Sequence, residues 1–163
     1  TSKHKVLVGW ELPTEKNDED EPFLVWKRYT LSLHQNSQLR KDLESWRNKP
    51  FSKEELDGFV LVKLAGIPCM INIMHRDSDG TTYADVNSVM ALPRGTNVPE
   101  QVHDTVIFDI DEWDDDVFQS FSDNLQQTIK NSAEYKQKIN GPSVDENPET
   151  QDQHREEDSD IPF

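Results

Sequence analysis

The feature that most constrains the fold is a run of alternating apolar and polar residues between Phe23 and His34. Successive side chains of a β-strand point to opposite faces, so this run predicts a strand with one buried face. The buried face is expected to carry Val25, Tyr29, Leu31 and Leu33. The opposite face carries an aromatic ring, a cation and hydroxyl groups, at Trp26, Arg28, Thr30, Ser32 and His34. The chain is therefore expected to build a sheet whose open face offers a ring beside a positive charge.

Shorter segments with strand character flank this run on both sides. We expect strands at residues 5–10, 59–64, 69–76, 81–92 and 102–110. The sequence Asp77-Ser78-Asp79-Gly80 is typical of the tight turn of a β-hairpin. Residues 11–22 hold two prolines and six acidic residues, which predicts a loop.

Helix signals separate and follow these strands. Ser37 is a candidate N-cap for a helix over residues 38–47, and a capping box at residues 52–55 opens a short turn that ends at Gly58. Ser122 and Ser132 are candidate caps of C-terminal helices. Five to six short strands with inserted and C-terminal helices favour a small β-barrel of the OB-fold type. A β-sandwich and an open α+β sheet are the alternatives.

The C-terminal segment differs sharply in composition from the rest of the chain. Residues 140–163 contain eight acidic residues and one arginine, and their only large apolar residues are Val144, Ile161 and Phe163. A segment with so much charge and so little apolar surface is expected to be disordered. We therefore expect one domain over residues 1–140 and an acidic tail over residues 141–163.

A net charge of −15 argues against a nucleic-acid partner, but the charge is unevenly distributed. Residues 22–95 contain ten Lys/Arg and eight Asp/Glu, whereas residues 96–163 contain four Lys/Arg and eighteen Asp/Glu. A binding groove acts over about a Debye length, roughly 8–10 Å in physiological salt. The charge of the strand-rich segment therefore matters more than the total.

The last residues combine acidic side chains with an apolar end. Asp158 and Asp160 lead into Ile161-Pro162-Phe163, a pattern that suits a peptide steered by charge and anchored by its apolar side chains. A tail that only keeps the protein soluble is the alternative. The segment resembles the partner-binding tip of bacterial single-stranded DNA-binding proteins. That resemblance implies that Asp158, Asp160, Ile161, Pro162 and Phe163 recruit replication, repair and recombination proteins.

A second resemblance covers most of residues 23–138. The runs 26–34, 39–47 and 49–51 are similar to bacteriophage proteins from replication and recombination genes. Those proteins are considered OB-fold binders of single-stranded DNA. The resemblance implies a DNA-binding protein of phage replication, recombination or repair in the cytoplasm of an infected bacterial cell.

Binding of single strands requires cations for phosphates and aromatic rings for bases. Residues of these types gather in and near the predicted sheet. The candidate DNA-binding residues are Trp26, Arg28, Trp46, Arg47, Lys49, Arg76, Tyr83 and Arg94. For Trp46 the alternative is packing of the small helix on the barrel. Met70, Met74 and Met90 are expected to pack in the core.

The sequence gives little support for a metal site or an enzyme active site. The five histidines lack ligand spacing, and a lone Cys69 excludes a zinc knuckle. The acidic run at residues 109–116 lacks the glycine and the terminal glutamate of a calcium loop, and no nucleotide-binding or nucleophile motif is present. We therefore expect no enzyme activity, no metal and no cofactor, and a two-metal nuclease is the remote exception.

These patterns together predict a non-enzymatic single-stranded DNA-binding protein with little sequence preference and a partner-recruiting tail. The alternative is an adaptor or inhibitor that imitates the tail, binds host replication or repair proteins and does not touch DNA. The single cysteine and the lack of an apolar run near the roughly 18 residues of a membrane span favour the cytoplasm. A homo-oligomer is compatible with both interpretations.

Overall fold

A computed structural model of the chain describes residues 3–141. Its contacts divide the chain into two units, residues 1–107 and residues 108–163, and each unit is described by itself. The first unit contains two antiparallel hairpins and small helices, so it is β-rich, as expected. The second unit is helical where it is described. No helix within residues 3–141 is both long enough and apolar enough to cross a membrane.

The first hairpin pairs β1 (Lys5–Lys16) with β2 (Pro22–Thr30). Its tip is closed by Asn17, whose side-chain oxygen accepts hydrogen bonds from the backbone N–H groups of Glu19 and Glu21 at 2.9 and 3.0 Å. An asparagine that bonds to backbone two residues ahead stabilises a turn locally. The expected loop over residues 11–22 is therefore wrong for residues 11–16, because the strand continues into a long hairpin.

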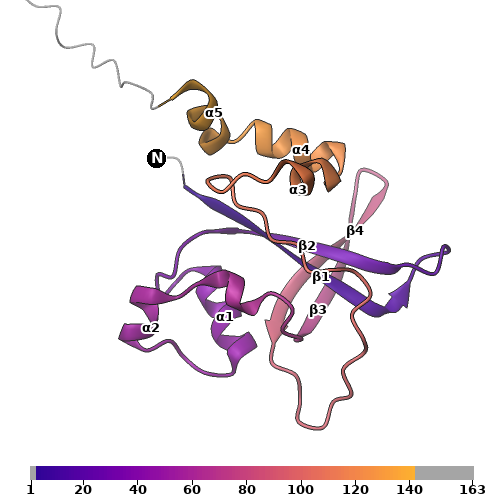
Figure 1. The fold of residues 1–163 in the computed structure, drawn as a ribbon. Helices are drawn as coiled ribbons and strands as arrows, with labels where there is room; N and C mark the ends of the chain where they lie inside the picture. Colours follow the sequence, from indigo (N-terminus) through magenta and orange to yellow (C-terminus); the bar gives the residue numbers. More distant parts are fainter. Residues whose placement is uncertain (1–2, 142–163) are drawn as a thin grey trace, which may run out of the picture. The chain divides into compact units, whose positions relative to one another are not determined.

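The second hairpin pairs β3 (Met70–Ser78) with β4 (Thr81–Met90), as the turn sequence predicts. Asp79 and Gly80 have φ values of 52° and 77°, the left-handed conformation that a two-residue hairpin turn requires. One extra residue, Asn87, interrupts the register on the β4 side. The two hairpins cross one another (Figure 1).

The core of the first unit lies between the inner faces of the hairpins and one helix. Val25 of β2 packs with Val86 and Val89 of β4, which joins the two hairpins. A neighbouring cluster buries Tyr29 with residues of α1 (Gln38–Arg47) and of the segment after it. Ser37 caps α1 by accepting a hydrogen bond from Arg40 N, as predicted. The expected inward orientation of Val25 and Tyr29 is confirmed. The prediction is wrong for Leu31, which is 53% exposed, because β2 ends at Thr30 and does not continue to His34.

Two further short elements follow α1. The predicted capping box is present at the start of α2 (Lys53–Gly58), where Ser52 and Glu55 bond to each other's backbone N–H groups. After it, η1 (Leu61–Leu64) is a 3-10 helix. The strand expected at residues 59–64 is therefore wrong: this apolar segment packs Leu61 and Leu64 on the core as a helical turn.

The strand expected at residues 102–110 is also absent, because this segment has no regular secondary structure. The described part of the chain thus contains four strands in two two-stranded sheets, rather than the five or six that were expected. It shows no closed barrel. The OB-fold stays a prediction. The first unit has a β-rich fold with small helices.

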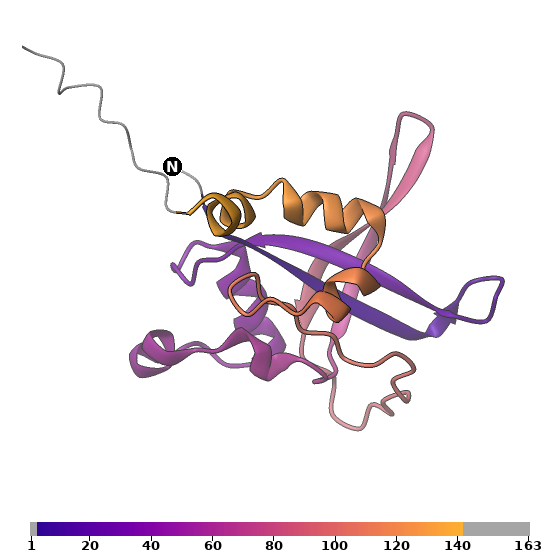
Figure 2. The same ribbon diagram turned by 45° about the horizontal axis from the view of Figure 1, so that its top comes forward.

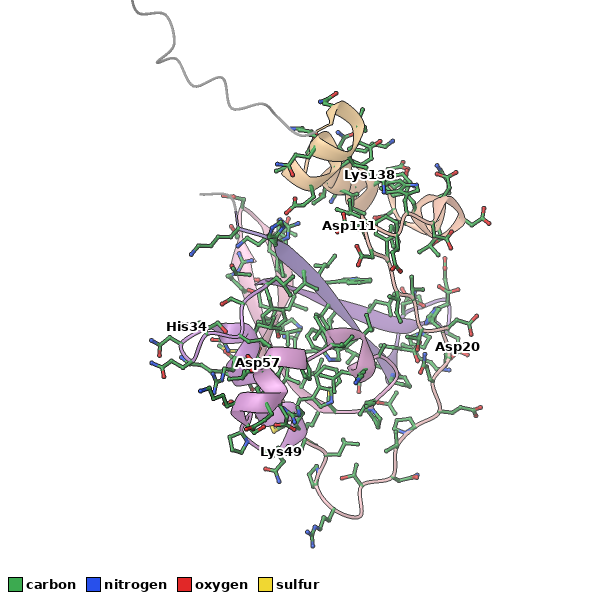
Figure 3. The ribbon with its side chains drawn as sticks, turned by 60° about the vertical axis from the view of Figure 1, so that its left-hand side comes forward. Asp20, His34, Lys49, Asp57, Asp111 and Lys138 are labelled. Atoms are coloured by element: carbon green, nitrogen blue, oxygen red, sulfur yellow. The ribbon has the colours of Figure 1, made fainter. Side chains whose placement is uncertain are left out.

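The second unit builds three short helices around aromatic rings. These are α3 (Asp115–Ser120), α4 (Asp123–Lys130) and α5 (Ala133–Asn140), and Ser122 and Ser132 cap the last two as predicted. The rings of Trp113 and Phe118 lie 4.5 Å apart between centroids. Lys138 Nζ donates hydrogen bonds to the carbonyl oxygens of Ile110 and Asp111, and Figure 3 shows Asp111 and Lys138 close together.

A buried carboxylate joins α1 to β2. Asp42 is 6% exposed, and its oxygens accept hydrogen bonds from Tyr29 Oη at 2.6 Å, Lys27 Nζ at 2.8 Å and Gln38 Nε2 at 2.7 Å. Burial and the hydrogen bond to Asp42 raise the pKa of Tyr29 well above its usual range. A buried charge is tolerated only when it is paired and hydrogen-bonded, and Asp42 meets both conditions.

Replacing Asp42 with alanine is expected to lower the free energy of unfolding by about 3 kcal/mol, because it leaves the Lys27 ammonium and the Tyr29 hydroxyl without their acceptor. Urea unfolding followed by circular dichroism measures the change. The control is Asp57→Ala, which removes an exposed carboxylate from α2. Equal stability of the two variants would show that the Asp42 network does not hold the unit together.

Candidate nucleic-acid interface

The outer face of the first hairpin carries an exposed indole ring. Trp26 of β2 pairs with Gly9 of β1, and the side chain of Trp26 is 49% exposed. A Cβ atom placed on Gly9 would lie 2.4 Å from Cζ3 of Trp26, far closer than two carbon atoms can approach. The ring therefore lies against the bare backbone of Gly9, and its exposed part forms a platform on the outer face.

Cations flank this platform on the same face. Arg28 follows Trp26 by two positions, is exposed, and makes no ion pair or hydrogen bond with the residues that the structure describes. Lys5, at the start of β1, donates a hydrogen bond from Nζ to Thr30 Oγ1 at 2.7 Å. The predicted proximity of a ring and a free cation on the open face of β2 is thus present.

Glu11 of β1 binds the loop that contains Val102 and His103 to the same face. This carboxylate accepts hydrogen bonds from the backbone N–H groups of Val102 and His103, both at 2.7 Å, and lies 2.6 Å from His103 Nδ1. Burial alone would raise the pKa of Glu11, but these hydrogen bonds outweigh it and hold the pKa below its usual value. The loop after β4 therefore binds the β1 strand two residues beyond Gly9.

Two further predicted residues lie on the outer face of the other hairpin. Arg76 of β3 and Tyr83 of β4 are a cross-strand pair, and the guanidinium lies 4.9 Å from the ring centroid. Arg76 Nε also donates to Asp85 Oδ2 at 2.7 Å, which raises the pKa of Arg76 and lowers that of Asp85. Arg76 therefore already has a counter-ion, whereas Arg28 has none within residues 3–141.

The three predicted residues at the end of α1 are engaged within the protein. Trp46 packs into the core beside Trp10, with 6.2 Å between the ring centroids. Arg47 stacks on the ring of Phe51 at 4.2 Å, and Arg47 Nη2 lies 2.6 Å from Glu55 Oε1. Lys49 Nζ lies 2.8 Å from the same oxygen, although the Lys49 side chain remains exposed (Figure 3).

Arg94 lies in the loop after β4, where it is exposed and without an ion pair among the described residues. The eight predicted residues thus fall into separate groups, on the outer faces of two different hairpins, at the end of α1 and on a loop. Among the five cations predicted to bind DNA, Arg28 and Arg94 have no acidic partner in residues 3–141. The predicted partner-binding residues, Asp158 and Asp160 to Phe163, lie outside the described residues.

The sequence reasoning missed Gly9, Lys5 and Glu11. A glycine inside a strand often marks a place where another group approaches closely, and this signal was available at Gly9. No local signal points to Glu11, because its partners lie more than 90 positions away in the chain. Met70, Met74 and Met90 were expected in the core, but all three are exposed on the outer face of the second hairpin, so that prediction is wrong.

Other candidate sites are limited. Within residues 3–141, no group of three or more His, Cys, Asp or Glu side chains is placed to hold a metal ion. The second unit has an open hollow of about 480 Å³, whose walls include Trp113, Phe118, Tyr135 and Lys130. Cys69 is half-buried, and burial raises the pKa of its thiol to about 11.

Comparisons of the chain with protein-family models, with curated proteins and with solved structures gave no match.

Glu55 is expected to make the stability of the first unit depend on pH in the acid range. Hydrogen bonds from Lys49 and from the backbone N–H of Ser52, together with Arg47, lower the pKa of Glu55 to about 2 from a usual 4.5. Between these values the folded chain keeps the carboxylate charged and the unfolded chain protonates it, so stability falls as pH is lowered from 4.5 towards 2.

Urea unfolding at several pH values between 2 and 5 measures this dependence. The Glu55→Gln variant is expected to show a shallower loss of stability in that range than the parent. The matched control is Glu54→Gln, which changes the exposed neighbouring residue of α2. Identical pH profiles for Glu55→Gln and the parent would contradict the lowered pKa.

Proposed function

We propose that this chain is a non-enzymatic single-stranded DNA-binding protein of phage replication, recombination or repair. The observation that carries the proposal is the outer face of the first hairpin, where the Trp26 ring lies on Gly9 and Arg28, which has no ion pair among the described residues, lies beside it. The resemblance of residues 23–138 to phage single-strand binders supports it. The expected setting is the cytoplasm of an infected bacterial cell.

The arrangement suits the chemistry of a single strand. A base stacked on an aromatic side chain contributes about 1–3 kcal/mol, and it does so for every base because each has a π-face. Arg28, with no carboxylate partner in residues 3–141, is free to neutralise a phosphate, and Lys5 adds a second positive charge on the face. Binding by stacking and charge implies little sequence preference and a strong dependence on salt.

The other candidate residues are expected to contribute to DNA binding to different degrees. Tyr83 is exposed on the second hairpin, and Figure 2 shows the far end of that hairpin reaching away from the other strands. Arg94 is exposed and unpaired within the described region. Arg47, Lys49 and Arg76 would each have to give up a carboxylate partner, so their contribution to phosphate binding is expected to be smaller.

The tail belongs to the same proposal. Asp158, Asp160, Ile161, Pro162 and Phe163 are proposed to recruit replication, repair and recombination proteins, as the resemblance to host single-strand binders implies. The tail is acidic like DNA, so it is also expected to compete with a single strand for positive charges on the first unit.

A second candidate function is favoured by the pairing of charges. Six of the thirteen Lys and Arg side chains of the first unit, including Arg47 and Arg76, form ion pairs with carboxylates, which reduces the positive charge that is available to phosphates. An adaptor that imitates the host tail and binds host replication or repair proteins needs no DNA surface. Absence of single-strand binding, even after removal of residues 141–163, would favour the adaptor.

Trp26→Ala is expected to weaken binding of a fluorescein-labelled oligo-dT by about tenfold, because it removes a stacking interaction of about 1–3 kcal/mol. Fluorescence anisotropy at several salt concentrations gives the dissociation constants. The control is Phe23→Ala, which removes an equally exposed ring, also 49%, from the opposite face of β2. The proposal fails if Trp26→Ala binds like the parent, or if the affinity of the parent is flat from low to high salt.

Phe163→Ala is expected to abolish recruitment of partners while single-strand binding stays unchanged or becomes slightly stronger. Pull-down of host replication and repair proteins that bind the host tip measures the first effect, with a synthetic peptide of residues 156–163 as competitor. Anisotropy with oligo-dT measures the second. Weaker DNA binding by Phe163→Ala would show that the tail is part of the DNA surface and has been assigned wrongly.

A further inference from the structure

β3 is an edge strand whose outward side has no backbone partner in the described part of the chain. The sheet consists of β3 and β4, and no backbone hydrogen bond joins β3 to any other described segment. The strand is nine residues long. An edge strand of this length presents a row of unpaired N–H and C=O groups, which is a template for another strand.

The other three strands carry features that discourage pairing at an edge. β1 contains Pro13 and two lysines, and β2 contains Pro22 and Lys27. β4 contains the bulge at Asn87, and the residue after the strand, Ala91, bonds through its N–H to Ser45 of α1. Proline, lysine and bulges are the usual means by which proteins protect sheet edges. β3 has no proline, no lysine and no bulge on its side of the register, and its charged residues, Arg76 and Asp77, lie together near its end.

The face beside this edge carries three methionines, and its charged side chains are paired with each other. Met70 and Met90 form a cross-strand pair, 38% and 37% exposed, and Met74 on β3 is 56% exposed. The polar groups between them bond to each other, since Arg76 pairs with Asp85 and Asn87 Nδ2 donates to Asn72 Oδ1 at 3.2 Å. Flexible methionine side chains adapt to a partner surface. Among the described residues, the charged side chains of this face, Arg76 and Asp85, pair with each other.

We propose that two copies of this chain associate through β3, antiparallel and about a two-fold axis at Met74. A register centred on Met74 pairs the full length of both strands. It sets Met74 against Met74 of the second copy and Asn72 against Arg76, and it places no like charges opposite each other. The hairpins of the two copies then form one continuous four-stranded sheet.

A second copy is the occupant that the strand itself favours, because the register centred on Met74 is self-complementary. The net charge of −15 on each chain opposes association over most of the surface, so two copies can approach closely only where the surface carries no net charge. The β3 edge and its methionine face meet that condition. A two-fold interface uses the same patch on both copies, and an antiparallel strand pair is self-complementary in this sense. This inference does not depend on the proposed function, because Trp26 and Arg28 lie on the other hairpin.

Met74→Lys tests the inference, because it places two lysines opposite each other at the axis. Sedimentation velocity over a hundredfold range of protein concentration is expected to show a dimer in the parent and a dissociation constant at least about tenfold weaker in Met74→Lys. The matched control is Met90→Lys, the same substitution on the same face but on β4, which is expected to retain more of the dimer. Circular dichroism verifies that both variants fold.

A covalent test fixes the register. In a Cys69→Ser background, Met74→Cys is expected to form a disulfide-linked dimer under mild oxidation, because directly opposed residues of antiparallel strands lie within disulfide reach. The control Thr82→Cys, on the other strand and the other face, is expected not to cross-link.

A parent chain that is monomeric at every concentration overturns the inference. It is equally overturned by a dimer that Met74→Lys leaves unchanged, since the copies would then associate elsewhere. Failure of Met74→Cys to cross-link while a dimer is present rules out the register centred on Met74. None of these outcomes bears on oligo-dT binding by Trp26, which is measured separately.

Discussion

The buried carboxylate of Asp42 is the interaction on which the first unit depends. It brings together a helix and a strand by accepting hydrogen bonds from Lys27 and Tyr29 of β2 and from Gln38 of its own helix. Because these bonds lie in a poorly solvated region, loss of the acceptor leaves groups that cannot return to water. The inner face of β2 is thereby fixed, and its outer face, with Trp26 and Arg28, is fixed with it.

The two faces of β2 show how one strand serves both stability and function. The side chains that point inward pack in the core or bind Asp42. One of them is Lys27, a cation that pairs with Asp42 and is therefore not available to a phosphate. The positions that point outward keep a ring on Gly9 and a guanidinium with no partner in the described residues. The alternative functions differ on whether this small outward surface is enough to hold a single strand.

Local patterns predicted the parts of the fold that are stabilised locally. The alternation in β2, the turn at Asp79-Gly80 and the serine caps of α1, α4 and α5 are all present, because each depends on residues a few positions apart. The segments at residues 59–64 and 102–110 have strand-like sequences, yet neither forms a strand. The first packs as a helical turn, and in the second the backbone of Val102 and His103 is bound by the side chain of Glu11.

The sequence by itself determined which residue types alternate along each strand, where the turns and caps lie, and that the charge is concentrated after residue 96. Only the tertiary structure decided which cations are free, since Lys27, Arg47 and Arg76 meet their carboxylates across 8 to 15 positions and Arg28 meets none in residues 3–141. It also placed the methionines on the outside and left one side of β3 without a backbone partner in the described part of the chain. These features depend on contacts between segments that are distant in the sequence, and no local sequence pattern predicts such contacts.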